Sequence, residues 1–181
     1  GTAKGGALSK KDFGVAFGGG GGVPSYDLEW EQTDGGELQG LKVGGNTAAG
    51  LTFYTGQTMI GKVPNKVTCY LKTLFSPVGI ATLKLISSTN VVKITYTPTQ
   101  DAAALTTSFA EYSFTNDSTS TTIADGDRLV WFYSGSASFV FEMAATATEV
   151  YTQQSYSTDN VNWSSYDVGD YPSKIKIYSL N

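Results

Sequence analysis

Histidine is absent from this 181-residue sequence, and cysteine occurs once, at Cys69. The absence of histidine removes the commonest general base, the imidazole metal ligands, and the Ser-His and Cys-His nucleophile pairs. A single cysteine cannot form an intramolecular disulfide, and the alternating stretch KVTCYLKTLF (66–75) places Cys69 at a buried strand position, as a small core hydrophobe. Because no acid, base and nucleophile converge, we expect a protein that is not an enzyme and needs no cofactor.

Charge is scarce as well, since Asp, Glu, Lys and Arg make up 15% of the chain and the net charge is −4, with a pI near 4.7. This balance argues against a nucleic-acid partner and against an anionic membrane surface. No run reaches the roughly 18 apolar residues of a membrane-spanning helix, so we expect no membrane span. The sequence starts at Gly1 without a methionine, which fits either a processed product or a trimmed form.

What the sequence has in abundance is strand-forming material. Hydrophobic residues make up 40% and aromatic residues 13%, and 18 serines and 23 threonines supply most of the polarity. Thr, Tyr, Val, Ile and Phe suit pleated, half-buried surfaces, and this many aromatics can fill a core. The length predicts one domain, with or without an additional arm.

From Tyr26 onward, apolar and polar residues alternate in short runs separated by turn sequences. YDLEWEQ (26–32) predicts a half-buried strand with Tyr26, Leu28 and Trp30 on one face. The apolar runs RLVWFYS (128–134) and SFVFEMA (138–144), joined by SGSA, predict a central hairpin. Only TQDAAALTTS (99–108) could form a helical turn. Further strands are predicted with these inward faces: Val67, Cys69 and Leu71; Ala81, Leu83 and Leu85; Val92, Ile94 and Tyr96; Ala110, Tyr112 and Phe114; Ile175 and Ile177.

About eight to ten short strands without intervening helices predict an all-β fold, an antiparallel two-sheet β-sandwich. Among sandwiches we favour a jelly roll, in which two sheets bury the aromatic rows between them. The domain is expected to span residues 26–181, and the glycine-rich residues 1–25 are expected to form an extended N-terminal arm.

Three motifs stand out between residues 57 and 178: Leu105, Phe109, Tyr112 and Phe114 in a strand; Gly126, Asp127, Arg128 and Leu129 in a turn and strand; and Asp159, Asn160 and Trp163 in a late hairpin, with Asn in place of Gly. With these motifs, residues 57–178 resemble the jelly-roll modules of secreted, cell-surface and virion proteins, many of which are related to carbohydrate-binding modules. The resemblance covers about two-thirds of the chain. It implies an extracellular, cell-surface or virion location and an extracellular β-sandwich, and it fixes no ligand.

The arm contains FGVAF (13–17) followed by five glycines. Ordering each glycine costs about 1–2 kcal/mol of backbone entropy, with few side-chain contacts to offset it, so an ordered arm needs a surface that holds it. In an extended conformation, Phe13, Val15 and Phe17 fall on one side, which suits a strand added to the open edge of a sheet. We expect these three side chains to anchor the arm on the sheet that receives it. The segment that leads from the anchors to the domain is expected to consist of Gly18, Gly19, Gly20, Gly21 and Gly22.

Two acceptors for the arm are open at this point, its own sandwich or that of a neighbouring copy. Glycines suit the second, because they let the backbone pass through a narrow gap between subunits, and a head-to-tail contact of this kind builds filaments or shells. The leading hypothesis is therefore a structural protein that self-assembles through a donor strand into a filament, surface layer or virion.

Two further groups of residues are candidate ligand sites. Asp125 and Asp127 flank Gly126 and could supply part of a structural Ca²⁺ site, although aspartates in turns also bond their own backbone. The alternative function is a carbohydrate-binding, adhesive module, because flat aromatic rings among Ser, Asn and Asp suit sugars. The aromatic residues concerned are Tyr156, Trp163, Tyr166 and Tyr171, which could equally pack at sandwich edges.

Overall fold

The computed structural model describes residues 24–32, 37–42, 44–135, 139–143, 152–165 and 173–181. Within them it contains thirteen β-strands and one short 3-10 turn. The expected helical turn within 99–108 is therefore present as η1. The elements are β1 (Tyr26–Gln32), β2 (Glu37–Leu41), β3 (Ala48–Phe53), β4 (Lys66–Thr73), β5 (Ile80–Ile86), β6 (Val92–Thr95), β7 (Gln100–Asp101), η1 (Ala102–Ala104), β8 (Ala110–Thr115), β9 (Arg128–Tyr133), β10 (Phe139–Met143), β11 (Thr152–Ser157), β12 (Ser164–Ser165) and β13 (Ile175–Leu180).

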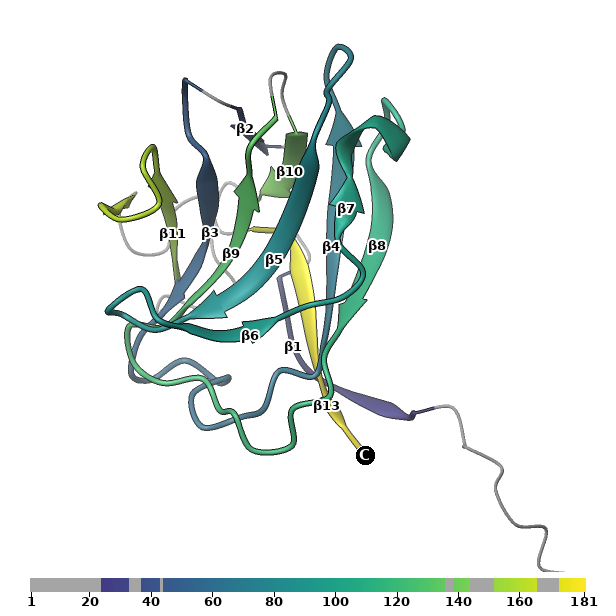
Figure 1. Cartoon of the computed structure of the whole chain (residues 1–181). Coiled ribbons are helices and arrows are strands. Elements are labelled where there is room, and N and C mark those ends of the chain that lie inside the picture. The colour runs from purple at the N-terminus through teal and green to yellow at the C-terminus, as the bar shows by residue number, and fades with distance from the viewer. Residues whose placement is uncertain (1–23, 33–36, 43, 136–138, 144–151, 166–172) are drawn as a thin grey trace, which may run out of the picture.

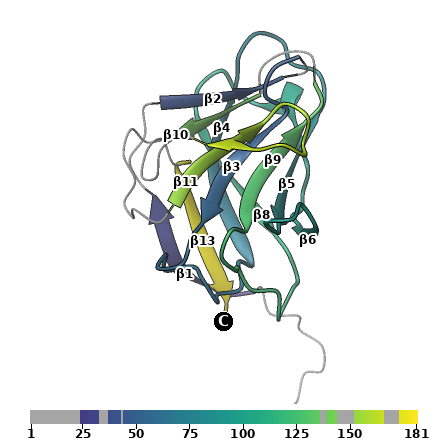
Figure 2. The same ribbon diagram turned by 90° about the vertical axis from the view of Figure 1, so that its left-hand side faces the viewer.

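Two antiparallel sheets pack face to face, as expected for a β-sandwich (Figure 1). The first sheet has the order β1-β13-β4-β10-β2, with β8 on the other edge of β4. The second has the order β12-β11-β3-β9-β5-β6, with β7 also paired to β5. The turned view in Figure 2 shows β1 and β13 of the first sheet to the left of β9 and β5 of the second.

Four of the strand pairs are nested in the order of the chain. β1 pairs with β13, β3 with β9, β4 with β8, and β5 with β6. The pairs β1–β13 and β4–β8 belong to the first sheet, and the pairs β3–β9 and β5–β6 belong to the second. Successive nested pairs therefore alternate between the two layers, so the chain crosses repeatedly from one sheet to the other.

The core lies between the sheets and is rich in aromatic rings. Trp131 of the second sheet contacts Phe114 and Phe139 of the first, with ring centroids 4.9 Å and 5.1 Å away. Trp30 meets Phe53 edge to face at 6.5 Å. Such pairs add to the free energy gained by burying the rings, so they hold the two layers in register.

Alternation predicted the inward faces of several strands correctly. The inward residues of β4, β5 and the first half of β13 are buried, and Lys174 and Lys176 are only partly buried beside them. On β8, Phe114 is buried and Glu111 is exposed. Gly126 adopts a φ of +77° in the predicted turn at 123–127, a conformation that favours glycine.

Three sequence predictions about strands are wrong. The runs at 128–134 and 138–144 do not pair as a hairpin, because β9 pairs with β3 and β5 whereas β10 pairs with β4 and β2. Val92 is exposed, although Ile94 and Tyr96 of the same run are buried, because the β5–β6 register shifts beside it. In β1, a register irregularity between Leu28 and Trp30 separates residues that alternation placed on one face.

No helix in the described parts of the chain is long and apolar enough to cross a membrane.

Candidate functional site

The irregularity in β1 places apolar side chains on the outer surface of the sandwich. Two residues of β1 are accommodated where regular pairing would place one, so the side chains before and after it point to opposite faces. Trp30 is therefore buried, with 6% of its surface exposed, whereas Leu28 is 49% exposed. A bulge of this kind has no signature in composition, and alternation alone therefore misassigned Tyr26 and Leu28 to the buried face.

The pairing of β1 with β13 gathers four large side chains on the outer face. Tyr26 lies opposite Leu180, and Leu28 lies opposite Tyr178. Directly opposed residues share a face of a sheet, as do residues two apart on one strand. We call this surface the ribbon face; it consists of Tyr26, Leu28, Tyr178 and Leu180.

A lysine of the neighbouring strand β4 borders the ribbon face. The Lys66 ammonium lies 4.9 Å from the ring centroid of Tyr178 and 5.6 Å from that of Tyr26. These cation–π contacts hold both rings on the same side of the sheet. Leu28 and Leu180 make no such contact and remain 49% and 44% exposed.

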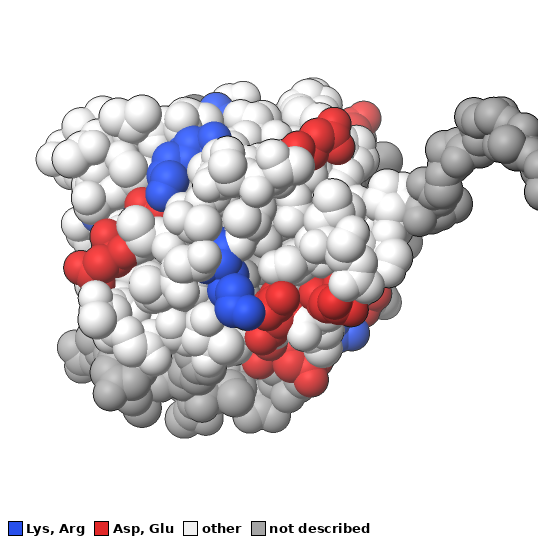
Figure 3. Space-filling view, turned by 90° about the horizontal axis from the view of Figure 1, so that it is seen from below, with Lys and Arg blue, Asp and Glu red and all other residues white. Residues whose placement is uncertain are grey.

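The predicted arm joins the molecule at this surface. The last residue of the chain ties down the beginning of β1, since the Asn181 backbone N–H donates to the Ser25 carbonyl at 2.9 Å. The Asn181 side-chain amide donates to Ser25 Oγ at 2.9 Å and to Asp27 Oδ1 at 3.1 Å. The surface where the described chain begins is mostly uncharged, with acidic side chains on either side (Figure 3). Phe13, Val15, Phe17 and Gly18 to Gly22 lie outside the described residues.

β1 is also an end strand of its sheet. It pairs with β13, and among the strands that the structure describes no other lies along its opposite edge. An edge strand presents backbone N–H and C=O groups that can pair with an incoming strand. The ribbon face and this edge are adjacent, since both belong to β1.

The two candidate calcium ligands point to different protein partners. Asp125 Oδ1 accepts hydrogen bonds from the Thr55 backbone N–H at 2.7 Å and from the Thr55 hydroxyl at 3.0 Å. Asp127 is buried, and its Oδ2 accepts from the Ala124 N–H at 2.8 Å and from the Lys93 ammonium at 2.5 Å. The Lys93 ammonium thus stands beside Asp127 where a bound cation would stand.

No group of three or more His, Cys, Asp or Glu side chains gathers among the described residues. A Ca²⁺ ion requires six to eight oxygen ligands. The arrangement around Asp125 and Asp127 instead matches turn-forming aspartates.

Trp163, a candidate sugar-binding residue, is engaged by the protein itself. Its indole N–H donates to Asn90 Oδ1 at 2.8 Å, and the Arg128 guanidinium lies 5.2 Å from its ring centroid. Phe132 meets the same ring edge to face at 6.4 Å. Trp163 therefore holds the loop after β11 against the outer side of the second sheet.

The loop before Trp163 is organised by a single carboxylate. Asp159 accepts hydrogen bonds from the backbone N–H groups of Asn162 and Val161 and from the Asn162 side chain. These bonds favour the ionised form and hold the pKa of the Asp159 carboxyl well below its usual range. The predicted late hairpin motif thus forms a hydrogen-bonded turn between β11 and β12.

The other predicted sugar-binding aromatics do not join Trp163 in the described structure. Tyr156 lies opposite Ala49 of β3 and packs against the core between the sheets. Tyr166 and Tyr171 lie outside the described residues. These residues are close in sequence, which suggested a common site, but the alternation of side chains along β11 places Tyr156 on the inner face of the sheet.

We expect Trp163→Ala to lower the free energy of unfolding by about 2 kcal/mol, because it removes a partly buried ring and leaves Arg128 unstacked. Trp163→Phe retains a ring and should cost about half as much. Urea denaturation measures both. Equal stability of Trp163→Ala and the parent protein would show that the ring does not hold the loop.

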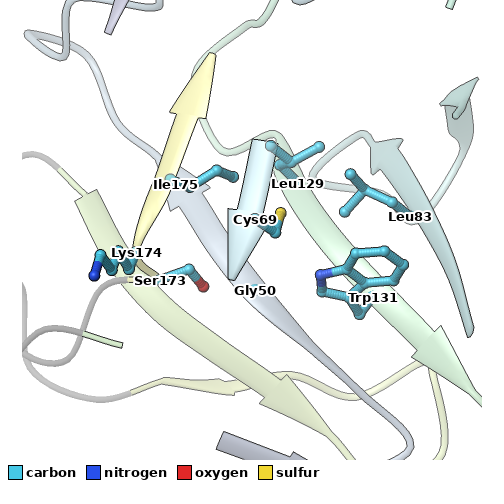
Figure 4. Close-up of a pocket in the computed structure, with 8 residues that line it drawn as sticks. All are labelled: Gly50, Cys69, Leu83, Leu129, Trp131, Ser173, Lys174 and Ile175. Atoms are coloured by element: carbon cyan, nitrogen blue, oxygen red, sulfur yellow. The ribbon is translucent and has the colours of Figure 1, made fainter. Parts of the chain in front are cut away.

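The interior contains a small cavity of about 10 Å³, lined by residues of both sheets including Cys69, Leu83 and Trp131 (Figure 4). It has room for one water molecule at most, so it holds no substrate or cofactor. Burial raises the pKa of the Cys69 thiol to about 12, as expected for an unreactive core cysteine. A larger surface hollow of about 320 Å³ lies beside Val63, Ser118 and Leu180, next to the ribbon face.

Comparisons with protein-family models, with curated proteins and with solved structures find no match for this chain.

Proposed function

We propose that this protein is a structural subunit of an extracellular assembly, a filament, surface layer or virion, whose copies are joined by N-terminal strand addition. The observation that carries the proposal is that the chain passes from its glycine-rich arm directly into β1, an end strand of the first sheet. The proposed donor and acceptor therefore belong to one chain, which is what head-to-tail polymerisation requires.

The nested strand pairs support a jelly roll as the fold of this subunit. A jelly roll is one long antiparallel hairpin rolled so that its successive strand pairs fall in alternate sheets. The pairs β1–β13, β3–β9, β4–β8 and β5–β6 follow this scheme, and β2, β10, β11 and β12 are additions to it. The extracellular location follows from the resemblance of residues 57–178 and belongs to the proposal.

The carbohydrate-binding alternative has weaker support. Trp163 gives its indole N–H and a ring face to the protein's own side chains, and Tyr156 packs inward. A sugar-binding platform needs aromatic faces that are free and convergent, and the described residues offer none in this group.

Sedimentation velocity of the full chain and of a chain lacking residues 1–22 tests the proposal. The full chain should form species larger than the monomer as its concentration rises, whereas the shortened chain should remain monomeric and keep the same circular dichroism spectrum. Assembly by the shortened chain, or a full chain that stays monomeric at every concentration, would refute the proposed function.

A further inference from the structure

We infer that the arm of one copy binds along the outer edge of β1 of a second copy, with Phe13, Val15 and Phe17 continuing the ribbon face. This inference rests on the proposed function and names the acceptor that it requires. Two observations define the acceptor: β1 has a described strand on one edge alone, and the adjacent outer face exposes Leu28 and Leu180.

The chemistry of the two surfaces is complementary. A strand added beside β1 would use the backbone groups of the open edge and alternate its side chains between the two faces of the sheet. One side of FGVAF (13–17) is wholly apolar, and the ribbon face is the apolar part of the outer surface next to that edge. The apolar side chains of the arm would cover Leu28 and lie next to the ring of Tyr26.

The lysines beside the ribbon face are already engaged by other groups of the protein. The nearest cation, Lys66, is already engaged with the rings of Tyr26 and Tyr178, so it borders the face without interrupting it. The charged pair nearest the bulge, Glu29 and Lys62, is joined at 2.8 Å.

The direction of the chain favours a second copy over the same molecule. Pro24 lies just before β1 and fixes its own φ, so the chain does not turn freely at that residue. A fold-back onto the same edge would have to reverse the chain beyond it. The beginning of β1 lies at the end of the sandwich, beside the C-terminus (Figure 1).

The reach of the arm is sufficient. Eight residue steps separate Phe17 from Ser25, and an extended chain spans at most about 3.5 Å per residue, or about 28 Å in total. This exceeds the spacing of several adjacent strands, each about 4.8 Å apart. The five glycines can then cross the gap between copies without side chains that clash.

Complementary variants test the acceptor. A chain lacking residues 1–22 keeps the ribbon face but has no donor, whereas Leu28→Lys combined with Leu180→Lys keeps the donor and places charge on the acceptor. Each variant alone should be monomeric, and an equimolar mixture should form a 1:1 dimer that light scattering after size exclusion detects. Ile80→Lys is the matched control, because Ile80 is 48% exposed on the second sheet, and it should assemble as the parent does.

The outcomes separate the inference from the proposed function. If the Lys variant assembles like the parent while the shortened chain does not, the acceptor lies elsewhere and the inference is overturned, although arm-mediated assembly stands. If the shortened chain assembles, the proposed function itself fails. A variant with Leu28→Ser and Leu180→Ser adds no charge, so it controls for misfolding caused by the lysines. It should weaken assembly at least tenfold. Failure of the shortened chain and the Lys variant to form a dimer when mixed would contradict the inference.

Discussion

Replacing Phe13, Val15 and Phe17 together by serine is expected to weaken self-association of the chain by at least about 30-fold. Full burial of a Val or Phe side chain stabilises by about 1.5–3 kcal/mol, and side chains that continue an outer face are covered on one side only, so the three together contribute at least about 2 kcal/mol. Each 1.4 kcal/mol corresponds to about tenfold in a dissociation constant. Sedimentation equilibrium over a concentration series measures the change.

The same segment supplies its own control. Gly14 and Ala16 alternate with the apolar row and fall on the other side of an extended strand. Gly14→Ser with Ala16→Ser should therefore change association by no more than about threefold, since exposed substitutions away from a packed surface have small effects. If both variants weaken association equally, the arm does not bind as a strand with one apolar side.

Asp127→Ala is expected to lower the free energy of unfolding by about 3 kcal/mol. The carboxylate is buried, and its loss leaves the Lys93 ammonium and the Ala124 N–H without their acceptor. Removing one partner of a buried ion pair costs about 3–5 kcal/mol, and the partial exposure of Lys93 places this pair at the lower end. Urea denaturation at neutral pH measures the loss, and the dependence of the unfolding free energy on urea concentration should stay unchanged.

Asp125→Ala is the matched control, two residues away in the same turn. Asp125 is exposed, and its carboxylate accepts hydrogen bonds from Thr55, so its loss should cost about 1 kcal/mol or less. Added Ca²⁺ should leave the unfolding midpoint of the parent protein unchanged. Equal losses for the two variants, or stabilisation by Ca²⁺ that either variant abolishes, would contradict this account of the turn.

The sequence predicts local alternation well, because burial on one side of a strand imposes a period of two. Val67, Cys69 and Leu71 are buried on β4 as that period requires, and Ile175 and Ile177 are buried on β13. The two-sheet sandwich follows from many such runs without helices between them. These properties depend on neighbours in sequence, so a single chain suffices to predict them.

Other features depend on residues far apart in sequence, and the pattern could not predict them. The Lys93–Asp127 pair joins two segments 34 residues apart, and Trp163 bonds Asn90 across 73 residues. The apolar run of β9 suggested a hairpin with β10, but its partners are β3 and β5. Which strands pair depends on the packing of the complete sheets, because several apolar strands could pair with the same edge.

The ribbon face shows how one local irregularity changes a functional interpretation. Regular alternation buries Leu28 with Trp30, and only the register against β13 reveals that Leu28 is exposed. The arm could be recognised from its glycines and its apolar row, whereas its acceptor could be recognised only from the fold.

Amide hydrogen exchange along β1 tests most directly whether copies are joined at this edge. We expect the amides on the outer edge of β1 before Gln32 to exchange at least about 100-fold more slowly in the assembled full chain than in the chain lacking residues 1–22, because strand addition gives them backbone partners. The amides of β8, the edge strand on the far side of the same sheet, should be unaffected. Equal exchange of β1 in the two proteins, or slowing at β8 in its place, would contradict the account.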